Sequence, residues 1–225
     1  MSEWWTYRLS SFLLFSPRTY LRLHERYNVD VWPAQLVALV IGVALLVILL
    51  RGPPKAARIV AFALAACWAF VAWAWHVMHY AAINWAATYF AAAFALQALL
   101  LLWVGVVRGA LAFGSASPTT AIVGNGLVAW GLIGLPILNA LFGQGIAQAD
   151  FFGTGADSTV AATLGVLLLA TGRRWPLWPI PLAWCAITGG FAAMMRLPAA
   201  PVMPLVALAA VLAAMFESRR RHRAA

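Results

Sequence analysis

The sequence predicts an all-α membrane protein, a polytopic bundle of about seven transmembrane helices preceded by an amphipathic helix at the membrane interface. Of its 225 residues, 64% are hydrophobic and only 9% are charged, whereas about a quarter of a soluble domain is charged. The apolar residues form continuous Ala- and Leu-rich runs instead of alternating with polar ones. Because only helices and closed barrels satisfy their backbone in lipid, this pattern favours helices.

Seven apolar runs are candidates for membrane spans. They are residues 32–50, 59–78, 85–107, 121–141, 158–171, 177–194 and 202–216. No Asp, Glu, Lys or Arg lies inside any of them. Since a bilayer core takes about 20 residues of helix, the short fifth run would need the residues just before it to complete the crossing. Six or eight spans are the alternatives.

The first 31 residues form a separate segment that we do not interpret as a signal peptide. Its apolar stretch at 4–15 has about 12 residues and contains Arg8, so it is too short and too polar to span. Ser16 and Pro17 are typical of a helix start, with Ser as the N-cap and Pro in the first turn. The residues that follow place one apolar, aromatic face at helical spacing, namely Tyr20, Leu23, His24 and Tyr27. We interpret this as an interfacial helix that anchors the first span. A lid over an outer cavity is the alternative.

The basic residues predict the orientation. With seven spans, ten of the fifteen Lys and Arg residues fall on one side of the membrane, including those of the basic tail at 217–225. Cytoplasmic loops are enriched in Lys and Arg, so we expect the C-terminus in the cytoplasm and the N-terminus outside. The transmembrane bundle would then occupy residues 32–216. Because the basic residues are scattered through short loops, the net charge of +9 does not indicate a nucleic-acid partner.

Several short motifs resemble those of a family of small, uncharacterised bacterial multi-pass membrane proteins, known as a domain of unknown function. The motifs are Tyr-Asn-Val-Asp-Val-Trp-Pro-Ala-Gln at 27–35, Ile-Asn-Trp-Ala-Ala at 83–87, Gly-Leu-Pro at 134–136, the loop at 143–158, Ile-Pro-Leu-Ala-Trp at 180–184 and Gly-Gly at 189–190. The chain departs from the family pattern at Trp85, where Pro is usual, and at 156–159, where Cys-Pro-Thr is frequent. The resemblance implies a membrane-embedded helical protein and brings no established activity. We expect the protein in the inner membrane of a bacterium.

The polar residues within or beside the spans gather near the predicted outer face. As a solute-binding or proton-relay set we select His76, His79, Asn84, Thr88, Gln97, Gln35 and Asn139. Only Gln97 in this set lies near the middle of a span. Since an unpartnered polar group in hydrocarbon costs several kcal/mol, these side chains should face the bundle interior or water. An outward-facing vestibule is the expected result.

His76 and His79 are the most distinctive pair. A spacing of three would place both imidazoles on one helix face, where they could bind a metal ion together with Asp150, Asp157 or His24. Contact with a proton or solute, and ordinary hydrogen bonding at the interface, are the alternatives. No nucleotide-binding loop occurs, and retinal is excluded because the sole lysine, Lys55, lies outside the spans.

Two further patterns concern the packing. The glycine-rich loop at 143–158 is either re-entrant or an ordinary outer loop, and Asp157 or Ser158 would cap the helix after it. Alanines recur every four residues at 61, 65 and 69 and again at 87, 91 and 95. Small residues let membrane helices approach closely, so spans two and three should form a tight hairpin.

These observations favour a transporter or channel for a small solute or metal ion, with its vestibule around His76 and His79. A non-transporting subunit or scaffold, with a second copy or another membrane protein as partner besides the lipid bilayer, is the first alternative. A His-centred metal-dependent membrane enzyme is the weakest, because the sequence has no Ser/His/Asp set and no multi-histidine box.

Overall fold

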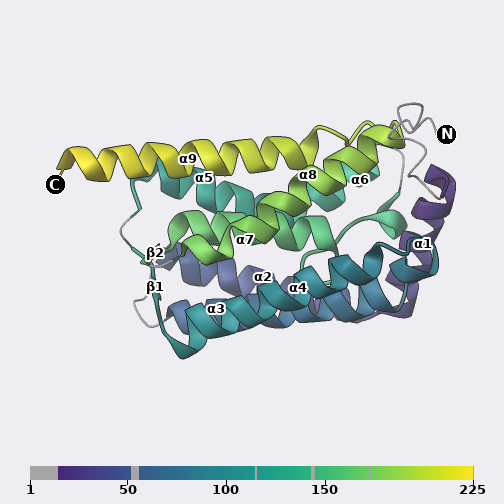
Figure 1. The fold of residues 1–225 in the computed structure, drawn as a ribbon, viewed down its shortest axis with the longest axis horizontal. Coiled ribbons are helices and arrows are strands. Elements are labelled where there is room, and N and C mark those ends of the chain that lie inside the picture. Colours follow the sequence, from purple (N-terminus) through teal and green to yellow (C-terminus); the bar gives the residue numbers. More distant parts are fainter. Residues whose placement is uncertain (1–14, 52–55, 115, 143–144, 173, 225) are drawn as a thin grey trace, which may run out of the picture.

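The computed structural model describes residues 15–51, 56–114, 116–142, 145–172 and 174–224, and these form one elongated helical bundle (Figure 1). Within these residues, six helices are long and apolar enough to cross a membrane: Ala34–Arg51, Ala56–Ala82, Ala87–Val107, Pro118–Leu141, Trp175–Met194 and Val202–Arg223. Large apolar side chains on several of them are exposed, for example Val40, Leu99 and Ile122. The protein is therefore a multi-pass membrane protein whose outer surface faces lipid.

The six long helices are α2 (Ala34–Arg51), α3 (Ala56–Phe70) with its continuation, α4 (Ala87–Leu101), α5 (Pro118–Ala129) with α6 (Leu135–Leu141), α8 (Pro179–Met194) and α9 (Val202–Ala224). Three contain π-helical segments, which are η3 (Val71–Val77), η5 (Leu102–Val107) and η6 (Trp130–Gly134). Short 3-10 turns lie at η4 (Tyr80–Ala82), η7 (Ile146–Gln148) and η8 (Trp175–Leu177). Helix α9 continues to Ala224, so the basic residues after position 216 extend this last helix.

The helix α7 (Ala156–Leu169) lies at the centre of the bundle. All its residues except Asp157 are buried, and it packs against α5, η6, α8 and α9. With 14 residues it is shorter than the six long helices. The predicted fifth span corresponds to this interior helix, which needs no lipid-facing side because its neighbours surround it.

The two ends of the bundle differ. At one end β1 (Leu111–Ala112) pairs antiparallel with β2 (Thr171–Gly172), with Leu111 opposite Gly172. This two-stranded ribbon was not predicted, and it places the ends of η5 and α7 side by side. At the other end lies α1 (Pro17–Asp30), in purple in Figure 1. We call these the ribbon end and the α1 end.

Helix α1 begins as the sequence predicts, because the Ser16 hydroxyl accepts a hydrogen bond from the Thr19 N–H. Its aromatic face packs on protein: Tyr27 is buried and donates a hydrogen bond of 2.6 Å to the Thr154 carbonyl, and His24 is buried beside Trp75. The helix therefore covers the end of the bundle, which fits both an anchor and a lid.

The predicted tight hairpin of α3 and α4 is present. Ala61, Ala65, Ala87 and Ala91 are buried, and a Cβ on Gly105 would collide with the Ala61 side chain. Small residues thus allow the close approach of η5, at Gly105, to α3, at Ala61.

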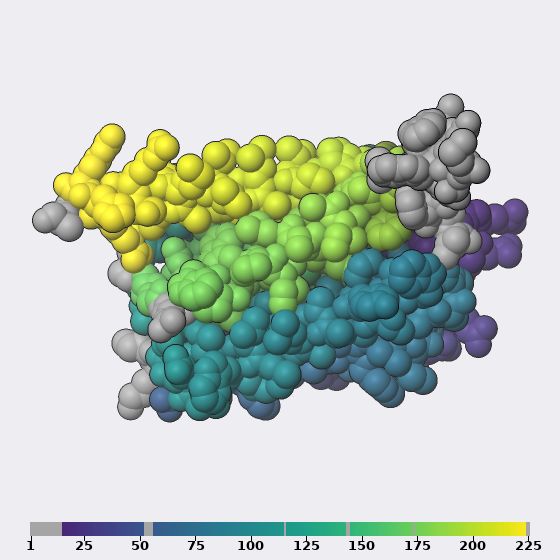
Figure 2. All heavy atoms as spheres, in the orientation of Figure 1, coloured from purple at the N-terminus to yellow at the C-terminus, as the bar shows by residue number. Residues whose placement is uncertain are grey.

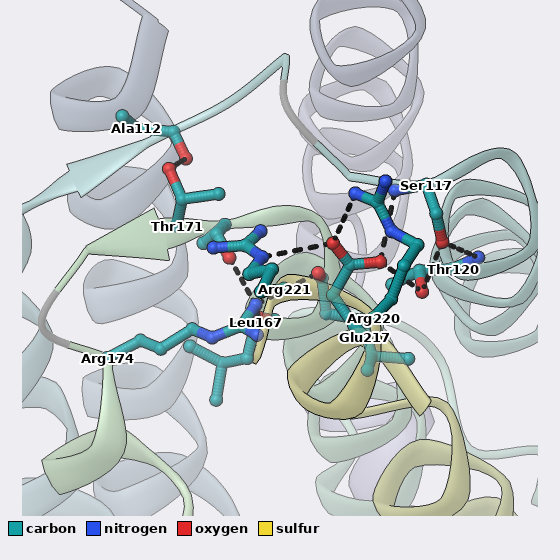
Figure 3. A network of polar contacts seen from close by, with 11 residues as sticks. Ala112, Ser117, Thr120, Leu167, Thr171, Arg174, Glu217, Arg220 and Arg221 are labelled. Carbon is teal, nitrogen blue, oxygen red and sulfur yellow. Dashed lines mark hydrogen bonds and ion pairs between the residues drawn. The ribbon is translucent and has the colours of Figure 1, made fainter. Parts of the chain in front are cut away.

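A buried carboxylate joins helices at the ribbon end (Figure 3). Glu217 on α9 is 1% exposed and accepts hydrogen bonds from the Ser117 N–H at 3.1 Å and the Thr120 hydroxyl at 3.0 Å, both at the start of α5. Arg220 and Arg221 each lie 3.0 Å from its other oxygen. The C-terminal part of α9, at Glu217, is thus fixed to the start of α5. Figure 2 shows α9, in yellow, lying along one edge of the molecule with α8 beside it.

Candidate functional site

The site begins with the carboxylate of Asp150, which caps the central helix α7. Its two oxygens accept hydrogen bonds from the N–H groups of Asp157 at 3.2 Å and Ser158 at 2.9 Å, and the Ser158 hydroxyl donates to the same carboxylate. Anionic groups are stabilised at a helix N-terminus. The predicted cap by Asp157 or Ser158 is wrong, because the N–H groups of both residues donate to Asp150, six residues before the helix begins.

Gly155 makes this approach possible. A Cβ at this position would overlap the Asp150 carboxylate, so only glycine leaves room for it. The Gly155 residue is itself the N-cap of α7.

A second carboxylate, Asp157, stands beside the first. One of its oxygens accepts a hydrogen bond of 2.7 Å from the Trp184 indole N–H, and the other accepts one of 3.1 Å from the Thr188 hydroxyl. Both donors belong to α8. Two carboxylates from the loop and from α7 are therefore held within one small region of the bundle interior.

Both carboxylates line a cavity of about 70 Å³ at the α1 end. The polar side chains around it are Tyr20, His24, Asn139, Gln148, Asp150, Asp157 and Thr188. A water molecule has a share of liquid volume of about 30 Å³, so the cavity has room for about two waters or one small ion. We call it the carboxylate cavity.

The charge balance of the carboxylate cavity favours a cation. Burial lowers the pKa of His24, whereas the nearby Asp150 carboxylate opposes this shift, so His24 is favoured in its neutral form. The N-terminus of α7 supplies about half a positive charge, which is less than the charge that two ionised carboxylates would carry. Like charges that close in a low-dielectric site repel strongly, and a proton or a metal cation relieves the repulsion.

The structure thus brings together three of the predicted residues, Asp150, Asp157 and Asn139, with His24 as a fourth. The two histidines selected first lie elsewhere. His76 is fully buried, with its ring 4.5 Å from that of Phe94 and 5.2 Å from that of Trp184. Neither of its nitrogens has a hydrogen-bond partner among the described residues.

His79 faces α1 instead. Its Nε2 lies 3.1 Å from an Asp30 oxygen, and its Nδ1 lies 2.7 Å from the Ala74 carbonyl. A spacing of three places two side chains on one face of an α-helix, but residues 71–77 form a π-helix, in which the Met78 N–H donates to the carbonyl of Trp73, five residues earlier. The wider turn rotates the two imidazoles toward different elements.

The four residues considered for a metal site therefore do not form one ligand set. Within the described parts of the chain, no group of three or more His, Cys, Asp or Glu side chains is arranged to hold a metal ion. His76 and His79 contact different helices, whereas Asp150 and Asp157 are engaged by α7 and α8.

The other predicted polar residues are dispersed. Gln97 is fully buried and donates a hydrogen bond of 3.1 Å to the Leu177 carbonyl. The buried Asn84 accepts from the Ala86 N–H, and the exposed Thr88 donates to the Trp85 carbonyl. Gln35 donates to the Asn28 carbonyl at 2.7 Å. None of these four lines the carboxylate cavity.

Sequence reasoning missed Trp184 and Thr188 as partners of Asp157. The motif at 180–184 was noted for its resemblance to a family, but its pairing with Asp157 depends on how α8 packs against α7. A Trp and a Thr four residues apart share a helix face, which was the available signal.

Comparison with known proteins places the chain in a family. No curated protein and no solved structure matches it. A family model described as "Family of unknown function (DUF6064)" matches residues 18–225, which includes every element of the carboxylate cavity. The resemblance seen in the sequence motifs is thereby confirmed, and the chain belongs to the family of unknown function DUF6064.

Proposed function

We propose that the protein moves a small monovalent cation, a proton or an alkali-metal ion, across a membrane, with the carboxylate cavity as its binding site. The observation that carries this proposal is the pair Asp150 and Asp157 in one cavity inside a membrane-embedded bundle. Ionisable groups are costly within membrane proteins, and they commonly mark an ion or proton pathway.

Further buried polar side chains extend from the cavity toward the interior of the bundle. Trp184 lies between Asp157 and His76: its indole N–H donates to the Asp157 carboxylate, and its ring contacts the His76 ring. Further along α7, the buried Thr163 accepts a hydrogen bond of 2.9 Å from the indole N–H of Trp68. His76 has no hydrogen-bond partner among the described residues, so it adds an unsatisfied buried polar side chain beside Trp184.

The proposed orientation places the carboxylate cavity outside. Most described basic residues lie at the ribbon end, namely Arg51, Arg58, Arg108, Arg174, Arg219, Arg220, Arg221 and Arg223. Because positive loops stay in the cytoplasm, the ribbon end and the C-terminus would face the cytoplasm of a bacterial cell, and the N-terminus the outside.

Cysteine labelling tests this orientation. A membrane-impermeant maleimide should label Ile146→Cys in intact cells and Arg219→Cys only after lysis, because both positions are exposed but lie at opposite ends. The native Cys67 and Cys185 are buried and give little background. The opposite labelling pattern would show that the protein has the reverse orientation.

Ligand-dependent stability tests the cation site. The purified protein should unfold at a higher temperature as the concentration of the bound cation is raised. The concentrations of Na⁺ and K⁺ and the pH are varied separately. A ligand at one hundred times its Kd stabilises by about 2.7 kcal/mol. Asp157→Asn should abolish this gain, whereas Asp30→Asn, a partly exposed carboxylate at the same end, should retain it. An equal response of both variants would refute the site.

A second candidate function, a membrane-embedded subunit, rests on a different observation. An apolar groove of about 590 Å³ lies between α3 and α4 and is lined largely by alanines, including Ala69 and Ala95. Small residues on an exposed face permit close approach of a partner helix. Co-purification of a stoichiometric membrane partner that a bulky Ala69→Leu change releases would favour this function.

A further inference from the structure

A groove separate from the carboxylate cavity opens at the α1 end. It lies between α1, the start of α2 and residues 145–152, and its volume is about 440 Å³. One part is polar, with Glu25, Asn28 and Gln35, and the rest is apolar, with Leu36, Leu39 and Phe152 among its walls. We call it the α1–α2 groove.

The polar and apolar parts follow one direction along α2. Gln35, Leu36 and Leu39 of α2 line the groove, and Trp32 lines it from just before the helix. At a rise of 1.5 Å per residue, residues 35 to 39 cover about 6 Å of the helix axis. The polar residues lie toward α1, and Leu39 lies toward the middle of the span. Trp32, Leu36 and Leu39 are 61%, 50% and 40% exposed, so the groove is open at the lipid-facing surface.

Gln35 supplies an unused hydrogen-bond acceptor. It is 7% exposed, and its amide nitrogen donates to the Asn28 carbonyl, whereas its Oε1 has no hydrogen-bond partner among the described residues. If the Gln35 amide were flipped, its oxygen would face the Asn28 carbonyl oxygen, which is unfavourable. The unpartnered Gln35 atom is therefore the oxygen, a hydrogen-bond acceptor. A ligand that completes this amide must carry an N–H or O–H donor.

The negative charge of Glu25 at the edge of the groove favours a positively charged donor. Glu25 makes no hydrogen bond or ion pair with another described side chain, and it lines the polar part. A positively charged N–H donor would satisfy both the Glu25 carboxylate and the free Gln35 oxygen, and the primary ammonium of a lipid headgroup is such a donor.

We propose that the α1–α2 groove binds one phospholipid with a primary ammonium headgroup, as in phosphatidylethanolamine. The ammonium contacts Glu25 and donates to Gln35, and an acyl chain lies against Leu36, Leu39 and Phe152. A choline headgroup has no N–H to donate, and a phosphatidylglycerol headgroup brings a net negative charge toward Glu25. With the same acyl chains in all three lipids, phosphatidylcholine tests the contribution of the N–H donor and phosphatidylglycerol tests the contribution of the headgroup charge.

Native mass spectrometry of the full chain in detergent tests the proposal. With one lipid added at a time, phosphatidylethanolamine should be retained roughly tenfold better than phosphatidylcholine or phosphatidylglycerol of the same chains, which is the size of effect expected from a charged hydrogen bond. Equal retention of the three lipids by the unaltered protein, or a preference for phosphatidylglycerol, would overturn the proposal.

Variants localise the effect. Glu25→Gln changes only an exposed rim residue and should reduce the preference for the ammonium lipid without affecting folding. Leu39→Trp should fill the apolar part and remove the preference, whereas Leu208→Trp, at a comparably exposed position on α9, should leave it unchanged. If the preference survives both Glu25→Gln and Leu39→Trp, the lipid binds elsewhere and the groove is not its site.

Discussion

Replacement of Asp150 by Ala is expected to lower the free energy of unfolding by about 3 kcal/mol, since it leaves the N-terminus of α7 without its cap. The N–H groups of Asp157 and Ser158 and the Ser158 hydroxyl all lose their acceptor. Ser158 is fully buried, so water cannot readily replace the carboxylate. Unfolding by sodium dodecyl sulfate, followed by tryptophan fluorescence in detergent micelles, measures the change.

Two further variants separate capping from a general effect of mutation. Gly155→Ala should cause a comparable loss, because its Cβ would displace the Asp150 carboxylate. Gly190→Ala is the matched control, since a Cβ there meets no atom within 4 Å and alanine is the better helix former. If Asp150→Ala proves as stable as Gly190→Ala, the carboxylate does not hold the central helix.

Replacement of Glu217 by Ala should destabilise the ribbon end by about 2 to 3 kcal/mol. Removal of a buried partner strands the groups that it had satisfied, here the Ser117 N–H and the Thr120 hydroxyl at the start of α5. Arg220 and Arg221 are partly exposed, so they can return to water, which holds the loss below that of a fully buried network.

Comparison with Arg220→Ala checks this explanation. That variant should cost less than about 1 kcal/mol, because it removes one partly exposed partner and leaves Glu217 bonded to α5 (Figure 3). Glu217→Gln, which keeps an acceptor, should be intermediate. Equal losses for Glu217→Ala and Arg220→Ala would show that the bonds to α5 contribute nothing.

Much of the fold could be predicted because the local composition of the sequence shows which segments can cross a membrane. Continuous apolar runs gave the six long helices, and the Ser16–Pro17 start and the alanine spacing gave details of α1 and of the α3–α4 hairpin. The fifth run was recognised as too short. Its burial on all sides depends on the packing of its neighbours, which no local pattern records.

The candidate site could be predicted only in part. Asp150, Asp157 and Asn139 were selected because they lie near the same predicted membrane face, and His24 as a candidate third ligand. Their convergence required long-range packing, since His24 comes from α1 and the Trp184 partner of Asp157 from α8. The histidine pair was given too much weight because an α-helical spacing was assumed where the chain forms a π-helix.

Cation flux into liposomes tests the central claim most directly. Protein reconstituted into sealed vesicles should carry protons or an alkali-metal ion down an imposed gradient, detected by an internal pH- or ion-sensitive dye. Asp157→Asn should reduce this flux at least about tenfold, since an ionised group that holds the cation is removed, while Asp30→Asn should conduct like the unaltered protein. Flux in Asp157→Asn equal to that of the unaltered protein would contradict the account.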